Sequence, residues 1–237
     1  MNTMFVRKVR IDWNQVSEDS YLREIQALAG MEEICFQGPV TFFAGENGTG
    51  KSTLLEAIAV AYGFNPEGGT RNYSFSTYDS HSELCDAVIL EQGIQRNKWG
   101  YFLRAESFYN VATREMEYAD ERHPSMRLHQ RSHGESFLDV LQSRLSEPGL
   151  YILDEPEAAL SPQRQLTLLI EMKRAVERGA QFIIASHSPI LLGYPGAHIL
   201  SFGNGELQWV GYEETESYQV TEMFINNREY LLKRLLE

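Results

Sequence analysis

The sequence predicts an α/β fold with a mainly parallel sheet at its core, and two observations carry this prediction. Residues 40–44 (VTFFA), 150–153 (LYIL) and 181–185 (QFIIA) are short apolar runs, typical of strands buried on both faces of a parallel sheet. The last two runs are joined by one long helical pattern over residues 162–178. Such a connection between neighbouring strands is parallel and right-handed.

The amino-terminal half predicts a strand, a buried strand, a helix and a hairpin in that order. Residues 4–11 alternate between apolar and polar positions, as a half-buried strand does. The apolar run 40–44 is followed by a helix over 51–63, which Gly63 ends. The remaining segments are a loop over 65–80 and two strands over 86–91 and 99–105, which we expect to pair as a hairpin around 93–98.

The carboxy-terminal half predicts alternating helices and strands. Residues 107–147 have a helical pattern, and a short helix follows Pro189, before a strand over 198–202. From residue 213 onward the pattern predicts two helices, whose leucines we expect to cover the sheet.

Composition limits the class of protein. A chain of 237 residues is long enough to bury a full core. Its formal net charge is −12 and its pI about 5.0, so the chain as a whole lacks the basic surface of a protein that binds duplex DNA. A local basic groove stays possible, and nucleic-acid binding is left open.

Cysteine usage and hydropathy predict a cytoplasmic protein. Cys35 and Cys85 form no spaced pair, and we interpret both as buried thiols in a reducing compartment. The first thirty residues do not resemble a signal peptide. No window approaches the run of about 20 apolar residues that spans a bilayer, so we expect no direct membrane insertion.

The stretch FFAGENGTGKSTLLEAIA predicts a phosphate-binding loop. It matches G-x-x-x-x-G-K-[ST] in a strand–turn–helix context. The glycines let backbone N–H groups point at phosphates, and the helix N-terminus adds partial positive charge. Lys51 would reach the β- and γ-phosphates of ATP, and Ser52 would bind Mg²⁺. The predicted nucleotide-binding residues here are Gly45, Glu46, Asn47, Gly48, Thr49, Gly50, Lys51, Ser52 and Thr53.

Two acids follow the predicted strand 150–153, and they predict a Mg²⁺ site and a general base. Asp154, at the strand tip, would hold Mg²⁺ directly or through water. Glu155 would act as the general base for a water that attacks the γ-phosphate. Adjacent acids alone are a weak signal, but they follow a matched phosphate loop and precede Pro156, and this favours a P-loop NTPase.

Three further segments resemble ABC ATPases. RSHGES (131–136) resembles their signature motif, with Glu135 in place of the usual glutamine. EAALSP (157–162) lies where they carry the D-loop, and His187 in IIASHSP (183–189) lies where they carry the switch histidine. The order of motifs is the ABC order, so the resemblance covers nearly the whole chain. GENGTGKSTLLEAIA, YFLRAESFYNVA, SHGES and ASHSP also resemble a group of small, stand-alone bacterial ABC-type ATPases known as predicted AAA-family ATPases.

This resemblance implies one ABC-type ATPase domain over 1–237, with a reduced helical subdomain over 107–147 and C-terminal helices over 213–237. It also implies an ATP-dependent homodimer with two Mg-ATP between the subunits. Ser132, Gly134 and Glu135 of one subunit would bind the nucleotide held by the other. His187 would contact the γ-phosphate within its own subunit.

Two roles stay open. Most ABC ATPases have a glutamine that contacts Mg²⁺ after a strand between the phosphate loop and the signature. The matching position here holds Glu106, with Gln92 as the competing candidate. Tyr21 and Phe36 are candidates for the aromatic residue that stacks on adenine, although we expect both in the core.

The spacing between the motifs indicates which branch of the ABC ATPases this chain resembles. Only 26 positions separate Glu106 from Ser132, too few for the helical subdomain of transporter ATPases or the coiled-coil arms of SMC-type proteins. We therefore expect a switch that acts on an unidentified protein partner. The alternatives are the ATP-binding subunit of an ABC transporter, or an ATP-gated, non-hydrolysing binding module in a DNA-repair or defence system.

Overall fold

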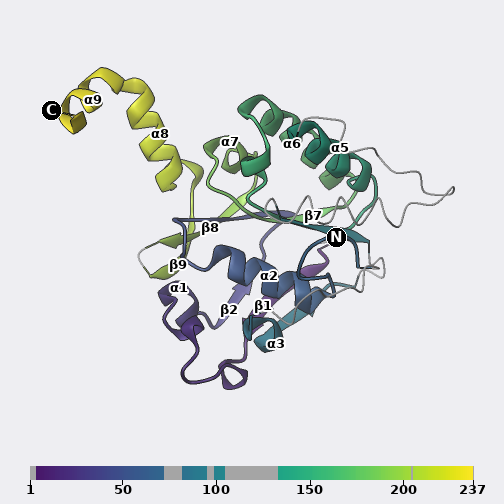
Figure 1. Ribbon diagram of the computed structural model, residues 1–237. Helices are drawn as coiled ribbons and strands as arrows, with labels where there is room; N and C mark the ends of the chain where they lie inside the picture. The colour runs from purple at the N-terminus through teal and green to yellow at the C-terminus, as the bar shows by residue number, and fades with distance from the viewer. Residues whose placement is uncertain (1–3, 72–81, 95–98, 105–132, 204, 237) are drawn as a thin grey trace.

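The computed structural model describes residues 4–71, 82–94, 99–104, 133–203 and 205–236. These residues form two sheets (Figure 1). The strands are β1 (Val6–Ile11), β2 (Glu33–Cys35), β3 (Val40–Ala44), β4 (Val88–Gln92), β5 (Gly100–Arg104), β6 (Leu150–Asp154), β7 (Gln181–Ala185), β8 (His198–Gly203) and β9 (Glu206–Val210).

The larger sheet has the strand order β5-β6-β7-β3-β8-β9. Its first five strands are parallel, and β9 runs antiparallel to β8 at the edge. The smaller sheet, in the order β2-β1-β4, is antiparallel. The predicted α/β class, a mainly parallel core with added antiparallel strands, is therefore confirmed.

Helices cover both faces of the larger sheet. In Figure 1, α2 and the smaller sheet lie on one face, and α5, α6 and α7 lie on the other. The helices are α1 (Gln26–Ala29), α2 (Lys51–Tyr62), α3 (Leu84–Ala87), α5 (His133–Arg144), α6 (Pro162–Glu177), α7 (Pro189–Leu192), α8 (Glu216–Asn226) and α9 (Arg228–Leu236). Short 3₁₀ turns occur at Trp13–Gln15, Tyr21–Arg23, Pro156–Ala159 and Tyr212–Glu214.

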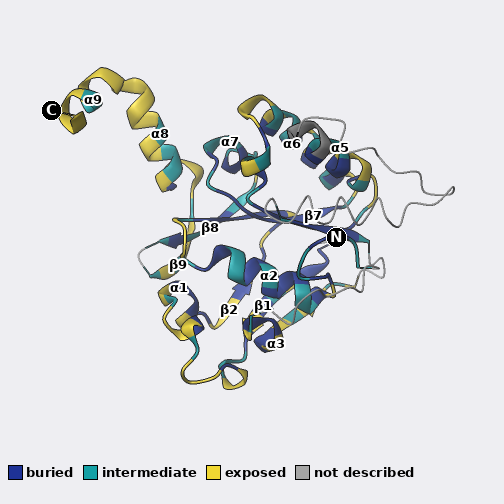
Figure 2. Ribbon diagram, in the orientation of Figure 1, coloured by how far each residue is buried: buried dark blue, intermediate teal, exposed yellow. Residues whose placement is uncertain are grey.

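The core forms two hydrophobic clusters, one on each face of the larger sheet. Strands β3, β6 and β7 are buried along their whole length, which explains their uninterrupted apolar sequences (Figure 2). Their register brings Asp154 opposite Ala185, and Ala185 opposite Phe43. The carboxyl ends of three central strands therefore meet at one edge, where the candidate site lies.

The predicted hairpin between β4 and β5 is wrong. Strand β4 pairs with β1 in the smaller sheet, whereas β5 pairs with β6 in the larger one. Burial explains the difference, because β5 is buried over its first four residues while β4 is largely accessible. Sequence analysis also missed the short strands β2 and β9. Most of the helical pattern over 107–147 lies outside the described residues.

Two expectations about burial are also wrong. Cys35 is exposed on β2, and only Cys85 is buried; burial raises the pKa of the Cys85 thiol to about 12. The C-terminal leucines do not cover the sheet, since Leu235 and Leu236 are 73% and 80% exposed. Helices α8 and α9 instead project from the body (Figures 1 and 2).

The buried side chain of Gln181 joins the amino-terminal strand to the larger sheet. Its Oε1 accepts hydrogen bonds from the N–H groups of Phe5 (2.7 Å) and Val6 (2.9 Å), and its Nε2 donates to the Val6 carbonyl (2.8 Å). Gln181 is 1% exposed, so no water can replace these bonds easily. The amide thus pairs three backbone groups between two sheets.

We expect Gln181→Leu to lower the free energy of unfolding by about 2 kcal/mol, because it leaves buried backbone groups without partners. Equilibrium urea denaturation measures this change. Gln163→Leu, at an exposed position of α6, is the matched control and should change stability little. Equal stability of both variants would show that β1 is not held by this amide.

Candidate nucleotide-binding site

The loop between β3 and α2 has the backbone that a phosphate-binding loop requires. Gly45, Gly48 and Gly50 have φ values of 142°, 80° and 96°, which favour glycine. A Cβ on Gly50 would lie 2.8 Å from Ile25 and 3.0 Å from Leu28, and so would press the loop away from its place. Helix α2 begins immediately after this loop, so its N-terminus faces the same space.

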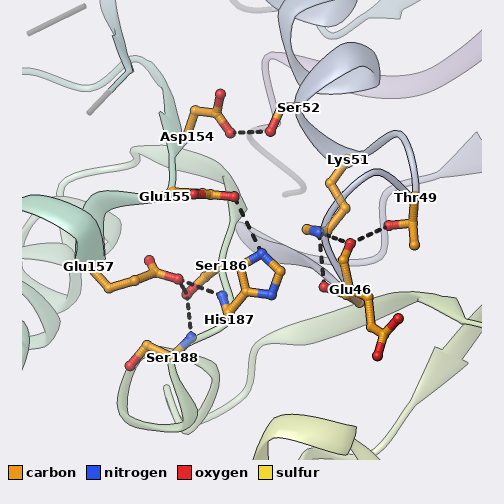
Figure 3. A network of polar contacts seen from close by, with 11 residues as sticks. Glu46, Thr49, Lys51, Ser52, Asp154, Glu155, Glu157, Ser186, His187 and Ser188 are labelled. Atoms are coloured by element: carbon orange, nitrogen blue, oxygen red, sulfur yellow. Dashed lines mark hydrogen bonds and ion pairs between the residues drawn. The ribbon is translucent and has the colours of Figure 1, made fainter. Parts of the chain in front are cut away.

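Lys51 lies inside the loop, as Figure 3 shows. Its Nζ donates to the carbonyls of Gly45 (2.8 Å) and Glu46 (2.6 Å), and the Thr49 hydroxyl donates to the Glu46 carbonyl (2.9 Å). Lys51 is 3% exposed. Burial lowers the pKa of its ammonium group below the ordinary value, and the carboxylates of Glu155 and Asp154 oppose that shift. The ammonium group is thus held ready beside the loop, and a phosphate could compete for it.

Ser52 and Asp154 form an oxygen-rich corner that suits Mg²⁺. The Ser52 hydroxyl donates to Asp154 Oδ1 at 2.8 Å, across the gap between α2 and β6. Mg²⁺ prefers oxygen ligands and is usually held by one or two protein groups together with phosphates and water. The described residues contain no group of three His, Cys, Asp or Glu that could hold a metal without a nucleotide. The donor set therefore fits Mg²⁺ bound with phosphates.

Glu155 and His187 meet beside this corner. His187 Nε2 lies 3.3 Å from Glu155 Oε1, and both side chains are partly accessible. Glu155 has φ 48°, the one positive value among the described non-glycine residues. Such a backbone is strained for a glutamate and occurs often at functional sites. The carboxylate points toward His187 (Figure 3), on the side where we expect a γ-phosphate and its attacking water.

Glu157, the first residue of the predicted D-loop segment, has a positioning role that sequence analysis missed. Its Oε1 accepts hydrogen bonds from the Ser186 hydroxyl (2.9 Å) and from the His187 N–H. The Ser186 hydroxyl in turn accepts from the Ser188 N–H at 3.1 Å. These bonds fix the turn that follows β7 and thereby place the imidazole (Figure 3). Its place in the sequence, two residues after Glu155, gave no signal of this role because the contacts are with residues about 30 positions away.

We expect Glu157→Ala to lower the turnover of ATP about tenfold, because two hydrogen bonds to a charged acceptor are lost. Steady-state phosphate release measures the effect. Since Glu157 acts through His187, the same change should have little effect in a His187→Ala background. If the two losses instead multiply, Glu157 does not act by positioning the histidine.

Arg104 and Glu56 are two more site residues without a sequence signal. Arg104 ends β5 opposite Asp154 in register, and its Nη1 lies 2.7 Å from Glu56 Oε2. Its Nε lies 3.6 Å from Asp154 Oδ2. The guanidinium group therefore balances two carboxylates beside the predicted metal position, and it lies near the second oxygen of Asp154, while the Ser52 hydroxyl donates to the first.

The two candidates for the aromatic residue that stacks on adenine differ in their exposure. Tyr21 is 59% exposed, so the expectation that it lies in the core is wrong, whereas Phe36 is buried at 5%. Tyr21 lines a pocket of about 680 Å³ with Ser52, Thr53, Glu56 and other residues. It also lines a second pocket beside Gly48 and Thr49. The adenine would find an accessible aromatic ring only at Tyr21 of this pair.

The predicted site residues Glu106 and Ser132 lie outside the described residues, as does most of the predicted helical subdomain over 107–147. Gly134 and Glu135 lie in the first turn of α5, of which the backbone is described. Gln92 ends β4 in the smaller sheet, opposite Val6, and is not part of the corner around Asp154. The geometry does not favour Gln92 as the metal-contacting residue.

Two family models match parts of the chain. Residues 21–130 match a model described as "AAA domain", and residues 136–193 match one described as "AAA domain, putative AbiEii toxin, Type IV TA system". The first contains the phosphate loop, and the second contains Asp154, Glu155 and His187. The two matched segments follow one another along the chain with a short gap between them.

Two curated relatives of this chain are named as ATP-binding proteins. The chain is 26% identical over 164 residues to the uncharacterized ABC transporter ATP-binding protein YthP of Bacillus subtilis, which covers 64% of this chain and 65% of the relative. It is 28% identical over 184 residues to the arabinose import ATP-binding protein AraG of Pseudomonas savastanoi, over 69% of this chain and 36% of the relative. The chain thus spans less than two thirds of the length of these two relatives.

The fold is similar to that of cbiO1 from Clostridium perfringens, part of the ABC transporter complex cbiONQ. The TM-score is 0.54 with 16% identity, over 94% of this chain and 95% of that chain. Within the described part of this chain, each helix is too short or too polar to cross a membrane. The sequence matches support a small ABC-type ATPase that binds ATP, and the solved structure supports the same fold.

Proposed function

We propose that this small ABC-type ATPase hydrolyses Mg-ATP and that two copies close around two nucleotides, as a switch on an unidentified protein partner in the cytoplasm. One observation supports the proposal above all. Lys51, Ser52, Asp154, Glu155 and His187 come from three separate segments, yet they meet at the mouth of one glycine loop. Together these residues supply the groups needed to bind the phosphates of ATP, to coordinate a metal ion and to activate a water molecule.

Each residue then has one task. Backbone N–H groups of the loop and the Lys51 ammonium group bind the phosphates. Ser52 and Asp154 would hold Mg²⁺, with Glu106 as a further candidate ligand, and the ion would supply positive charge that offsets the charge of the phosphates. Glu155 accepts a proton from the attacking water, while His187 lies against it at 3.3 Å and orients the γ-phosphate.

The second copy completes the site in this proposal. Ser132, Gly134 and Glu135 of the partner would approach the γ-phosphate, and the helix that begins at His133 would direct its N-terminus at the anion. ATP then holds the pair together, and hydrolysis releases it. The proposal also includes the domain organisation: residues 1–237 form one ATPase domain, with a helical subdomain over 107–147 and C-terminal helices over 213–237.

Two alternatives make different predictions. The relatives are equally consistent with a transporter subunit, which should co-purify with membrane proteins when it is isolated under mild conditions. A non-hydrolysing binding module should bind ATP without turnover. Glu155 favours hydrolysis over pure binding, because binding alone needs no base.

The experiment is phosphate release by the purified chain with saturating Mg-ATP, measured over a range of protein concentrations. A rate per chain that rises with protein concentration supports hydrolysis by a dimer. Tight binding of ATP without phosphate release would favour the gated module, and a rate per chain independent of concentration would contradict the shared site.

A further inference from the structure

The C-terminal arm, which we define as α8 and α9 (residues 216–236), is an uncovered helical surface. Neither helix contains a buried residue among those described, and Figure 2 shows the arm projecting from the body. Helices of 11 and 9 residues are only marginally stable in water when nothing packs on them. The exposed large apolar side chains of the arm are Val220, Met223, Phe224, Ile225, Tyr230, Leu235 and Leu236.

The arm begins at the candidate nucleotide site. A cavity of about 250 Å³ is bounded by Gly45, Glu46 and His187 on one side and by Ser217 and Val220 of α8 on the other. Val220, Met223 and Phe224 follow at spacings of three and four residues, so they share one face of the helix. An apolar row therefore runs outward from the γ-phosphate side of the site along α8.

We infer that the arm is a docking surface for the second copy of this chain, and that it forms part of the ATP-dependent dimer interface. This inference rests on the proposed function, which puts the partner's signature segment at the same opening. A partner that enters beside Glu46 and His187 must also pass the first turns of α8, because those turns line the cavity. The apolar row would then be covered when the dimer forms.

Charge favours a second copy over other occupants. The chain carries −12, so two copies repel over most of their surfaces, but the arm has three acidic and three basic side chains. It is thus a neutral surface on an acidic protein, which lowers the electrostatic cost of bringing two copies together. A helix that lies on an anionic membrane would instead be rich in Lys and Arg on its polar face, and this arm is not.

The size of the apolar surface also fits. Val220, Met223 and Phe224 are 52%, 48% and 41% exposed, so each keeps a large part of its surface free to be covered. A standard interface buries about 800 Å² on each partner, so the apolar row on α8 would supply one part of it, beside the contacts around the nucleotide. In a two-fold dimer the arm of each copy contacts the other copy, so any contact that an arm makes with the partner's body occurs twice.

The test compares Phe224→Glu with Asn226→Glu in full-length chains that also carry Glu155→Gln. Both substitutions add one negative charge at an exposed position of α8. Phe224 lies in the apolar row, whereas Asn226 lies about 200° around the helix from Phe224 and neighbours the row only at Met223. Sedimentation velocity with saturating Mg-ATP gives the dissociation constant of the dimer. Binding of a fluorescent ATP analogue shows whether each monomer is still folded and competent.

We expect Phe224→Glu to raise the dissociation constant of the dimer at least tenfold, with Asn226→Glu unchanged and ATP binding equal in both. If Phe224→Glu dimerises as tightly as its control, the arm is not part of the interface, and the proposed function stands. If the chain with an intact arm binds ATP but stays monomeric, the proposed dimer fails, and this inference fails with it.

Discussion

Glu155→Gln is expected to lower the rate of ATP hydrolysis by about 10²–10⁴-fold, the usual contribution of a general base. Glutamine has the shape of glutamate and can still contact His187, but it cannot accept a proton from water. ATP affinity should stay within about twofold, since Glu155 lies beside the loop and not among its phosphate-binding groups. Single-turnover hydrolysis and equilibrium binding separate the two effects.

Glu206→Gln is the matched control for this substitution. Glu206 begins β9 on an exposed edge of the sheet, far along the chain from the acids at β6. The control should hydrolyse ATP at the unchanged rate. A Glu155→Gln chain that keeps more than a tenth of the original rate would show that another group activates the water, and the strained backbone at Glu155 would need a different explanation.

Lys51→Ala is expected to weaken ATP binding about 100-fold. The substitution removes charge-assisted hydrogen bonds to the phosphates, each worth about 1.5–3 kcal/mol. It also removes the buried positive charge that faces the carboxylates of Asp154 and Glu155, so the repulsion between those acids and the phosphates is no longer offset. Titration with a fluorescent ATP analogue in the presence of Mg²⁺ measures the loss.

Lys173→Ala is the control for the lysine, because Lys173 is exposed on α6 and carries the same charge. It should bind ATP normally. If Lys51→Ala binds ATP as tightly as this control, the loop around Gly45 and Gly50 does not hold the triphosphate. The same variant should also fail to dimerise on ATP, because a nucleotide that does not bind cannot join two copies.

The sequence predicted the parallel core because burial leaves a simple pattern. Strands β3, β6 and β7 are covered on both faces, so their residues are apolar without interruption. Strand β4 has one accessible face and follows a short helix, and its neighbour in the chain, β5, belongs to another sheet. Local patterns do not encode which sheet a strand joins, which is why the hairpin prediction failed.

The site was predictable where chemistry needs fixed spacing. The loop before Lys51 and the two acids at the end of β6 have few acceptable sequences, because backbone N–H groups and strand tips must meet the phosphates. Glu157 and Arg104 escaped notice since their tasks depend on contacts with residues distant in sequence. The arm was misjudged for a related reason: an apolar helix face looks the same whether the sheet or another molecule covers it.

The most direct test of the account is the solution mass of Glu155→Gln with and without Mg-ATP, by light scattering on a sizing column. We predict a monomer without nucleotide and a dimer with it. We further predict that adding Ser132→Arg prevents the dimer while ATP still binds, because the signature segment serves the partner's nucleotide. A Glu155→Gln chain that binds ATP but stays monomeric, or a Ser132→Arg variant that dimerises normally, would contradict the shared site.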